Sequence, residues 1–163
     1  MSGRHRVKNV EPGLAHTSNA ERSIGGVVAG LGEINGAQDL RDCSHTDITP
    51  EYNRSIPGGL KNAIDWASRP YGKNSFSRKP SAVIGTSPGA LGTAIAQQHL
   101  RSLLGYCNSP QMNAPEAYIQ FTPGLIDDDG HVTTQSTEQF LQTYMNEFQG
   151  FIQRVYTVLP RNS

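Results

Sequence analysis

The residues best suited to chemistry lie in two short polar segments. In residues 49–58, TPEYNRSIPG, two prolines stiffen a stretch that carries Glu, Tyr, Asn and Ser. Residues 85–92, GTSPGALG, form a run of small residues directly after an apolar one. A rigid polar loop ahead of a helix suits ligand binding, and small residues let a flat ligand approach the backbone. On composition alone, residues 49–58 fit an ordinary loop before a helix nearly as well.

The second segment also matches the G-x-S-x-G nucleophile elbow of serine hydrolases, through Gly85, Ser87 and Gly89. Asp127 and His131 even follow in the chain order of a catalytic triad. The oxyanion hole, however, needs the backbone N–H of the residue after the serine, and that residue is Pro88, which has none. A serine hydrolase is therefore rejected.

Metal ligands are not predicted. Residues 127–130, DDDG, lack the alternating ligands and terminal Glu of a calcium loop, so we expect a solvated turn. Cys43, His45 and Asp47 have no partners at zinc spacing, so an exposed loop is expected there. His99 is expected to be a helix-surface residue.

The elements that position the two polar segments alternate along the chain. The apolar spacing predicts helices over 60–67, from about 93 to 107 and from 136 onward, with strands over 81–85 and 117–121. Strands that alternate with helices predict an α/β fold with a parallel sheet, in which 82–84 form a central strand buried on both faces. Residues 86–92 form the turn.

The last helix carries both a start signal and an apolar stripe. Ser136-Thr137-Glu138-Gln139 resembles a capping box with Ser136 at the N-cap and Gln139 at N3. The residues expected to be buried by this helix are Leu141, Met145, Phe148, Ile152 and Val155.

Length and composition narrow the class of protein. The 163 residues fit one domain, and a formal net charge of +0 gives no basic surface for nucleic acid. No apolar run reaches the roughly 20 residues of a membrane span, and no apolar region follows the basic start, so a cytoplasmic location is expected. Cys43 and Cys107 are expected to be idle thiols.

Three strings in the chain resemble a known family in order and spacing. TPEYNRSIPGGLKNAIDW, then KPSAVIGTSPGALGTAIAQQHLR and PEAYIQ, are similar to the NAD(P)H-dependent FMN reductases, above all the chromate and quinone reductase branch, over residues 49–156. The resemblance implies a flavodoxin-like three-layer sandwich, bound FMN and a homodimer or homotetramer. It also implies transfer of two electrons from NADH or NADPH to quinones, flavins, azo compounds or metal oxyanions such as chromate.

The resemblance also assigns cofactor contacts. Pro50, Glu51, Tyr52 and Asn53 are expected along the flavin and its ribityl chain, and Ser87 and Gly89 beside the isoalloxazine ring. The chemistry belongs to the flavin, so no catalytic side chain and no metal are assigned.

The first third of the chain departs from the family. All aromatic residues lie at or after Tyr52, and no phosphate loop of the form G-S-x-R-x-x-S-x-N is intact in residues 1–48. Three strands and two helices need roughly 50 residues, and Asp47-Ile48 is a poor match to the buried strand expected there. We therefore expect residues 1–48 to be an atypical or degenerate segment, truncated, rearranged or read in another frame, and residues 49–163 to be the C-terminal part of a flavodoxin-like domain.

Two further interpretations stay open. One is a non-catalytic truncated homologue that dimerises without FMN, and the other is a flavodoxin-like module for a different ligand. Self-association is predicted through residues 96–107 and 115–120, from the family resemblance and because Tyr106, Met112 and Tyr118 are expected to be partly exposed.

Overall fold

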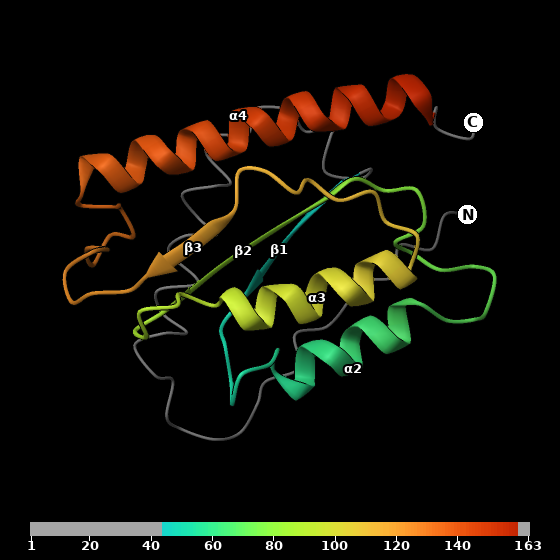
Figure 1. The fold of residues 1–163 in the computed structure, drawn as a ribbon, viewed down its shortest axis with the longest axis horizontal. Coiled ribbons are helices and arrows are strands. Elements are labelled where there is room, and N and C mark those ends of the chain that lie inside the picture. Colours follow the sequence, from blue (N-terminus) through green and yellow to red (C-terminus); the bar gives the residue numbers. More distant parts are fainter. Residues whose placement is uncertain (1–43, 160–163) are drawn as a thin grey trace, which may run out of the picture.

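The computed structural model describes residues 44–159, in which strands and helices alternate as predicted (Figure 1). The elements in chain order are β1 (His45–Thr49), α2 (Gly58–Ala67), β2 (Ser81–Ser87), α3 (Ala94–Tyr106), β3 (Ala117–Gln120) and α4 (Gln135–Val158). Of the segment predicted to be atypical, residues 1–48, residues 1–43 lie outside the described part of the chain.

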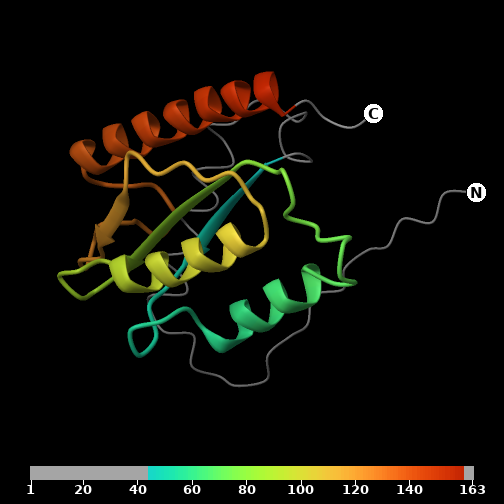
Figure 2. The ribbon, with the colours of Figure 1, turned by 45° about the vertical axis from the view of Figure 1, so that its right-hand side comes forward.

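The three strands form one parallel sheet in the order β1-β2-β3. Figures 1 and 2 show α4 on one face of this sheet and α2 and α3 on the other, so the α/β class and the three-layer arrangement are confirmed. Because the strands are parallel, the loops that follow them gather at one edge, at the left of Figure 1. This edge is where open α/β sheets bind ligands.

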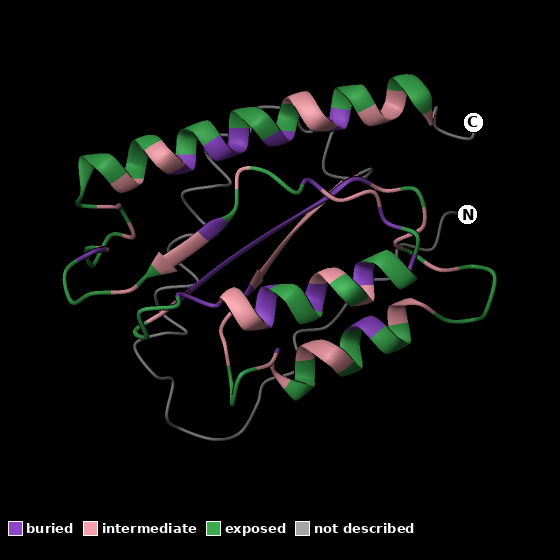
Figure 3. Ribbon diagram, viewed as in Figure 1, coloured by how far each residue is buried: buried purple, intermediate pink, exposed green. Residues whose placement is uncertain are grey.

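The central strand β2 anchors both layers, as predicted. Ala82, Val83 and Ile84 are at most 1% exposed, and Figure 3 shows β2 almost entirely buried. Since side chains alternate along a strand, Ala82 and Ile84 pack in the cluster under α4, whereas Val83 packs with α2 and α3.

The apolar stripe of α4 is confirmed, with one addition. Four of the five predicted residues, Leu141, Met145, Phe148 and Ile152, are buried, and Val155 is half-buried. Tyr144, which the apolar pattern missed, is fully buried and donates its hydroxyl to the Val83 carbonyl at 2.8 Å. Burial raises the pKa of this phenol well above its ordinary value.

The predicted start of this helix was wrong. The N-cap is Thr134, two residues before Ser136, and no side chain caps the helix end. Thr134 has the extended backbone usual for an N-cap, and its carbonyl accepts the Glu138 N–H at 3.0 Å. The helix therefore begins before Ser136, so Ser136 lies inside it and is not its N-cap.

The expectation for residues 45–48 was also wrong, because they form β1 and not an exposed loop. His45 and Asp47 are half-buried on the α2/α3 side, where their side chains approach to 3.2 Å and the imidazole lies against Phe76. Ile48 packs on the opposite face with the α4 cluster. The strand was not predicted because it mixes polar and apolar residues. These residues lie on opposite faces of the strand and pack against different layers.

The smaller helices agree with their predicted faces in part. In α2, Ile64 is buried and Leu60 and Ala67 are half-buried, but Ala63 is exposed. In α3, Ala96, Leu100 and Leu104 are buried. None of the helices in residues 44–159 has the length and apolarity that a membrane crossing requires.

Cys107, directly after α3, is buried among apolar side chains. Burial raises the pKa of its thiol, which keeps the reactive thiolate scarce. The expectation of an idle thiol fits this environment.

Candidate functional site

The two polar segments leave the sheet at adjacent positions. Thr49 at the end of β1 pairs with Gly85, two residues before the end of β2, so the first loop (residues 50–57) and the second loop (residues 87–93, counted from the last residue of β2) begin close to each other. Both lie at the carboxyl edge of the sheet (Figure 2). All six residues assigned from the resemblance therefore belong to one edge of the sheet.

The first loop contains a tight two-residue turn. Tyr52 and Ser55 exchange backbone hydrogen bonds of 2.9 and 3.0 Å across Asn53 and Arg54. These two central residues have φ of 51° and 63°, as in type I′ turns, where Asn is favoured and Arg is strained. The turn presents Asn53 and Tyr52 to solvent, and 45% of Tyr52 is exposed.

Glu51 points away from solvent, toward α3. One carboxylate oxygen accepts the backbone N–H groups of Ile95 and Ala96, each at 3.1 Å. Its other oxygen lies 3.6 Å from the Arg54 guanidinium. The side chain of Glu51 is 11% exposed, so it is occupied by the protein at the start of α3.

The second loop is shaped by short-range hydrogen bonds within itself. The Ser87 hydroxyl accepts the Gly89 N–H at 3.2 Å, and the Gly89 carbonyl accepts the Gly92 N–H at 2.9 Å. Ser87 also accepts the Phe121 N–H through its carbonyl at 2.8 Å. Gly89 and Pro88 are exposed, whereas Ser87 is half-buried.

Glycines let this loop lie close to the sheet. A side chain at Gly85 would collide with Thr93 and with the Thr49 carbonyl, and one at Gly92 would lie 2.8 Å from the backbone of Tyr118. Gly92 also has φ of 55°, which L side chains rarely adopt. The path of the second loop therefore requires glycine at both positions.

One contact of the first loop was not predicted from the sequence. His99 is exposed on α3, as expected, but its Nδ1 lies 3.0 Å from the Ser55 hydroxyl. Ser55 and His99 are 44 residues apart, so no local spacing could have paired them.

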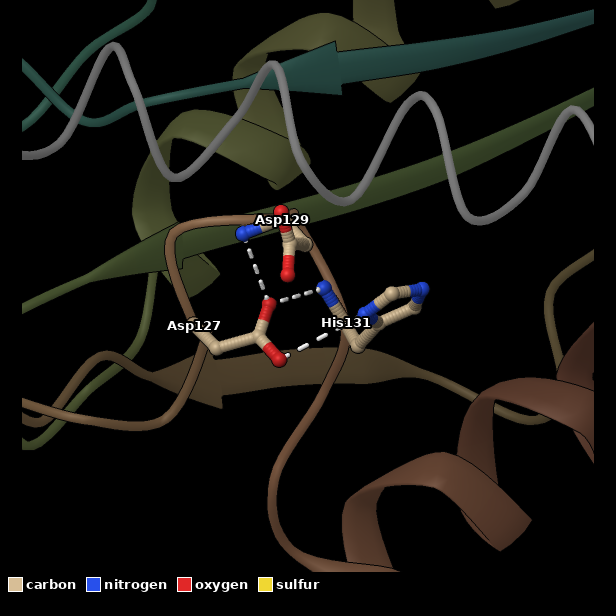
Figure 4. Close-up of side chains that lie close together, drawn as sticks. All are labelled: Asp127, Asp129 and His131. Atoms are coloured by element: carbon tan, nitrogen blue, oxygen red, sulfur yellow. Dashed lines mark hydrogen bonds and ion pairs between the residues drawn. The ribbon is translucent and has the colours of Figure 1, made fainter.

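The acidic turn after β3 is solvated, as expected. Asp127, Asp129 and His131 are exposed and lie close together (Figure 4). One Asp127 oxygen accepts the backbone N–H groups of Asp129 and His131 at 3.0 and 2.8 Å. These bonds lower the pKa of the Asp127 carboxyl, above all through His131. The carboxylate thus organises its own turn.

Known proteins resemble this chain over the region that contains both loops. The sequence model described as NADPH-dependent FMN reductase matches residues 48–124. A 2-hydroxy-1,4-benzoquinone reductase of a Burkholderia species is 50% identical over 105 residues, which cover 64% of this chain and 57% of that protein. A quinone reductase of Escherichia coli K12 is 42% identical over 109 residues, covering 66% of this chain and 57% of its own length.

A solved structure agrees with the sequence matches. The flavoenzyme NAD(P)H:(acceptor) oxidoreductase FerB from Paracoccus denitrificans has a TM-score of 0.66 and 45% identity, and the match covers 78% of this chain and 68% of FerB. The chain spans a little over half the length of the curated relatives it matches. With an alternating α/β fold, two polar loops at its carboxyl edge and these matches, the chain belongs to the NADPH-dependent FMN reductase family.

Proposed function

We propose that this chain binds FMN across the first and second loops and passes two electrons from NADPH or NADH to a quinone-type acceptor. The observation that carries this proposal is the adjacency of the two polar loops at the carboxyl edge of a parallel sheet. Relatives that carry the same region include a benzoquinone reductase and a flavoenzyme, which supports the proposal.

The exposed groups of the two loops fit a flat, polar-edged ring. Asn53 offers an amide and Tyr52 an aromatic face from the first loop, and the half-buried Ser87 offers a hydroxyl from the second. Gly89 lets the ring approach the backbone. When bound, FMN supplies the two-electron chemistry. The protein's part is to hold and orient the ring, and we assign no catalytic side chain.

Among the described residues, the start of α3 does not offer a free binding site for the FMN phosphate. Helix N-termini commonly hold phosphate through free N–H groups, but Glu51 already occupies those of Ile95 and Ala96. In family order the phosphate loop falls in residues 1–48, whose sequence carries no intact motif of that kind. We therefore propose that binding energy comes mainly from the ring, and that FMN and riboflavin bind with similar affinity.

The remaining properties are proposals of the same kind. Free flavins, azo compounds and chromate are further candidate acceptors, and the cytoplasm is the proposed location. A homodimer or homotetramer is proposed through α3 and residues 115–120. Tyr106, 81% exposed, supports this surface, but the expectation for Met112 was wrong, because it is 2% exposed in the α4 cluster.

The direct test is the visible spectrum of the purified chain after reconstitution with FMN and removal of free ligand. We expect bound-flavin absorbance that bleaches with NADPH or NADH without oxygen and returns when a benzoquinone is added. A flavin-bound protein that neither nucleotide can bleach would refute the oxidoreductase. Titrations with FMN and riboflavin then test the phosphate: an FMN affinity a thousandfold higher would contradict our proposal of a ring-dominated site.

A non-catalytic homologue is the second candidate. It is favoured by the occupied N-terminus of α3 and by the lack of an intact phosphate-loop motif in the sequence of residues 1–48. This candidate predicts a folded, self-associating protein with no flavin absorbance after reconstitution.

A further inference from the structure

Helix α3 begins without a cap of its own. Thr93, at the N-cap position, has φ of 81°, which lies in the left-handed region, and its side chain makes no capping bond. Its hydroxyl instead accepts the Gln97 amide at 2.8 Å. The first turn of α3 contains no acidic residue. Both usual local sources of stabilisation at a helix start are therefore missing.

Glu51 supplies what the local sequence lacks. The first four N–H groups at the start of a helix have no partner in the helical ladder and need one from elsewhere. Ala94 donates to the Leu91 carbonyl at 3.1 Å, and Gln97 makes the first bond of the ladder, to the Thr93 carbonyl at 2.9 Å. Between them, the N–H groups of Ile95 and Ala96 lie before the ladder and donate to one oxygen of Glu51. Two N–H groups of the first turn thus depend on a carboxylate 44 and 45 residues away.

The first loop is tethered to α3 on both sides of its turn. Glu51 precedes the Tyr52–Ser55 turn and contacts the first turn of α3. Ser55 closes the turn and contacts His99, one helical turn further along. The second loop runs directly into α3 through Thr93. A movement of α3 therefore displaces both loops together.

We propose that Glu51 is a positioning residue that couples the two loops through α3, and that its carboxylate does not contact the flavin. This inference rests on the proposed function and names the role of one residue in it. A carboxylate that already accepts two N–H groups has a negative charge matched to the positive end of the helix. The groups that face the ligand are then Tyr52, Asn53 and the Ser87–Gly89 turn.

The test compares Glu51→Gln with Glu51→Ala. Gln retains a carbonyl oxygen that can accept both N–H groups, whereas Ala retains none. Amide hydrogen exchange without flavin measures the cap directly. We expect the Ile95 and Ala96 amides to exchange about fivefold faster in Glu51→Ala, the effect of a lost cap, and less than half as much faster in Glu51→Gln.

Riboflavin titration measures the consequence for the loops. We expect about fivefold weaker binding in Glu51→Ala, because a smaller fraction of the protein holds the loops in place, and substantial rescue in Glu51→Gln. If Gln weakens riboflavin binding as much as Ala while its Ile95 and Ala96 amides remain protected, the carboxylate acts on the ligand and the inference is wrong.

Two control variants separate this effect from the loss of any carboxylate and from a general loss of stability. Glu138→Ala removes an exposed carboxylate from the first turn of α4 and should alter neither measurement. Ile64→Val lowers stability from the core of α2 and should leave riboflavin affinity unchanged in the folded protein. If the wild type binds no flavin, the proposed function fails. Unchanged Ile95 and Ala96 exchange in Glu51→Ala would independently overturn the coupling.

Discussion

The first and second loops lie side by side but are held in place by different means. The first loop is held by side chains, through Glu51 on α3 and Ser55 on His99. The second loop is held mainly by hydrogen bonds within itself, from Gly89 to the Ser87 hydroxyl and from Gly92 to the Gly89 carbonyl, and by close backbone packing at Gly85 and Gly92. Substitutions in the first loop should therefore disturb the loop, whereas substitutions at the glycines should disturb the fold.

The largest effect is expected for Gly85→Ala. The added methyl would collide with Thr93 and with the Thr49 carbonyl, so β1, β2 and the start of α3 cannot all keep their positions. The free energy of unfolding should fall by about 3 kcal/mol, the upper end for overpacking. Urea denaturation followed by circular dichroism measures this, and a wild-type midpoint would show that the second loop is not held by packing.

Gly92→Ala should have a somewhat smaller effect. Its φ of 55° disfavours any side chain, and the methyl would lie 2.8 Å from the Tyr118 carbonyl carbon. We expect a loss of about 2 kcal/mol in the same denaturation experiment. Gly89→Ala is the matched control, since its methyl would meet only the Ser87 hydroxyl, at 3.5 Å.

Arg54→Gly should stabilise the protein, in contrast to both glycine substitutions. Arg54 has φ of 63°, and type I′ turns favour glycine at this second central position. The lost ion pair with Glu51 involves a side chain that is 65% exposed, so it is worth little. The net gain should be roughly 0.5 kcal/mol, measured as a higher melting temperature. A lower melting temperature would mean that the ion pair supports the first loop.

Ser87→Ala should cause the smallest loss of stability. It removes one partly exposed hydrogen bond, to the Gly89 N–H, and leaves the Phe121 bond to the Ser87 carbonyl intact. The expected loss in unfolding free energy is about 0.5 kcal/mol. A loss as large as that of Gly92→Ala would show that the hydroxyl, and not the glycines, holds the second loop.

Much of the fold was predictable because its apolar pattern is local. The run around Val83 identified a strand buried on both faces, and the spacing of Leu100 and Phe148 identified helix faces. β1 was missed because His45 and Asp47 look like loop residues in the sequence, whereas in the structure they are half-buried, close to each other, with the His45 ring against Phe76. Tyr144 was missed because its hydroxyl makes it look polar in the sequence. In the structure this hydroxyl donates to the Val83 carbonyl, which allows the side chain to be fully buried.

The candidate site was predictable in its location but not in its internal contacts. Proline, glycine and polar residues identified both loops, and parallel strands bring the loops to one edge. No pattern within the loops reveals that Glu51 caps α3 or that Ser55 meets His99, since these partners are 44 or more residues apart. The assignment of Glu51 as a flavin ligand stays a prediction, set against our proposal that it positions the loops.

The central claim is that flavin binds between the two loops, and amide chemical shifts recorded during a titration with FMN test it most directly. We predict that the largest shift changes fall in residues 50–55 and 87–93, with smaller changes at the start of α3. Changes confined to other surfaces, such as the outer edge of β3 near Glu116 and Phe140, with both loops unaffected, would contradict the account.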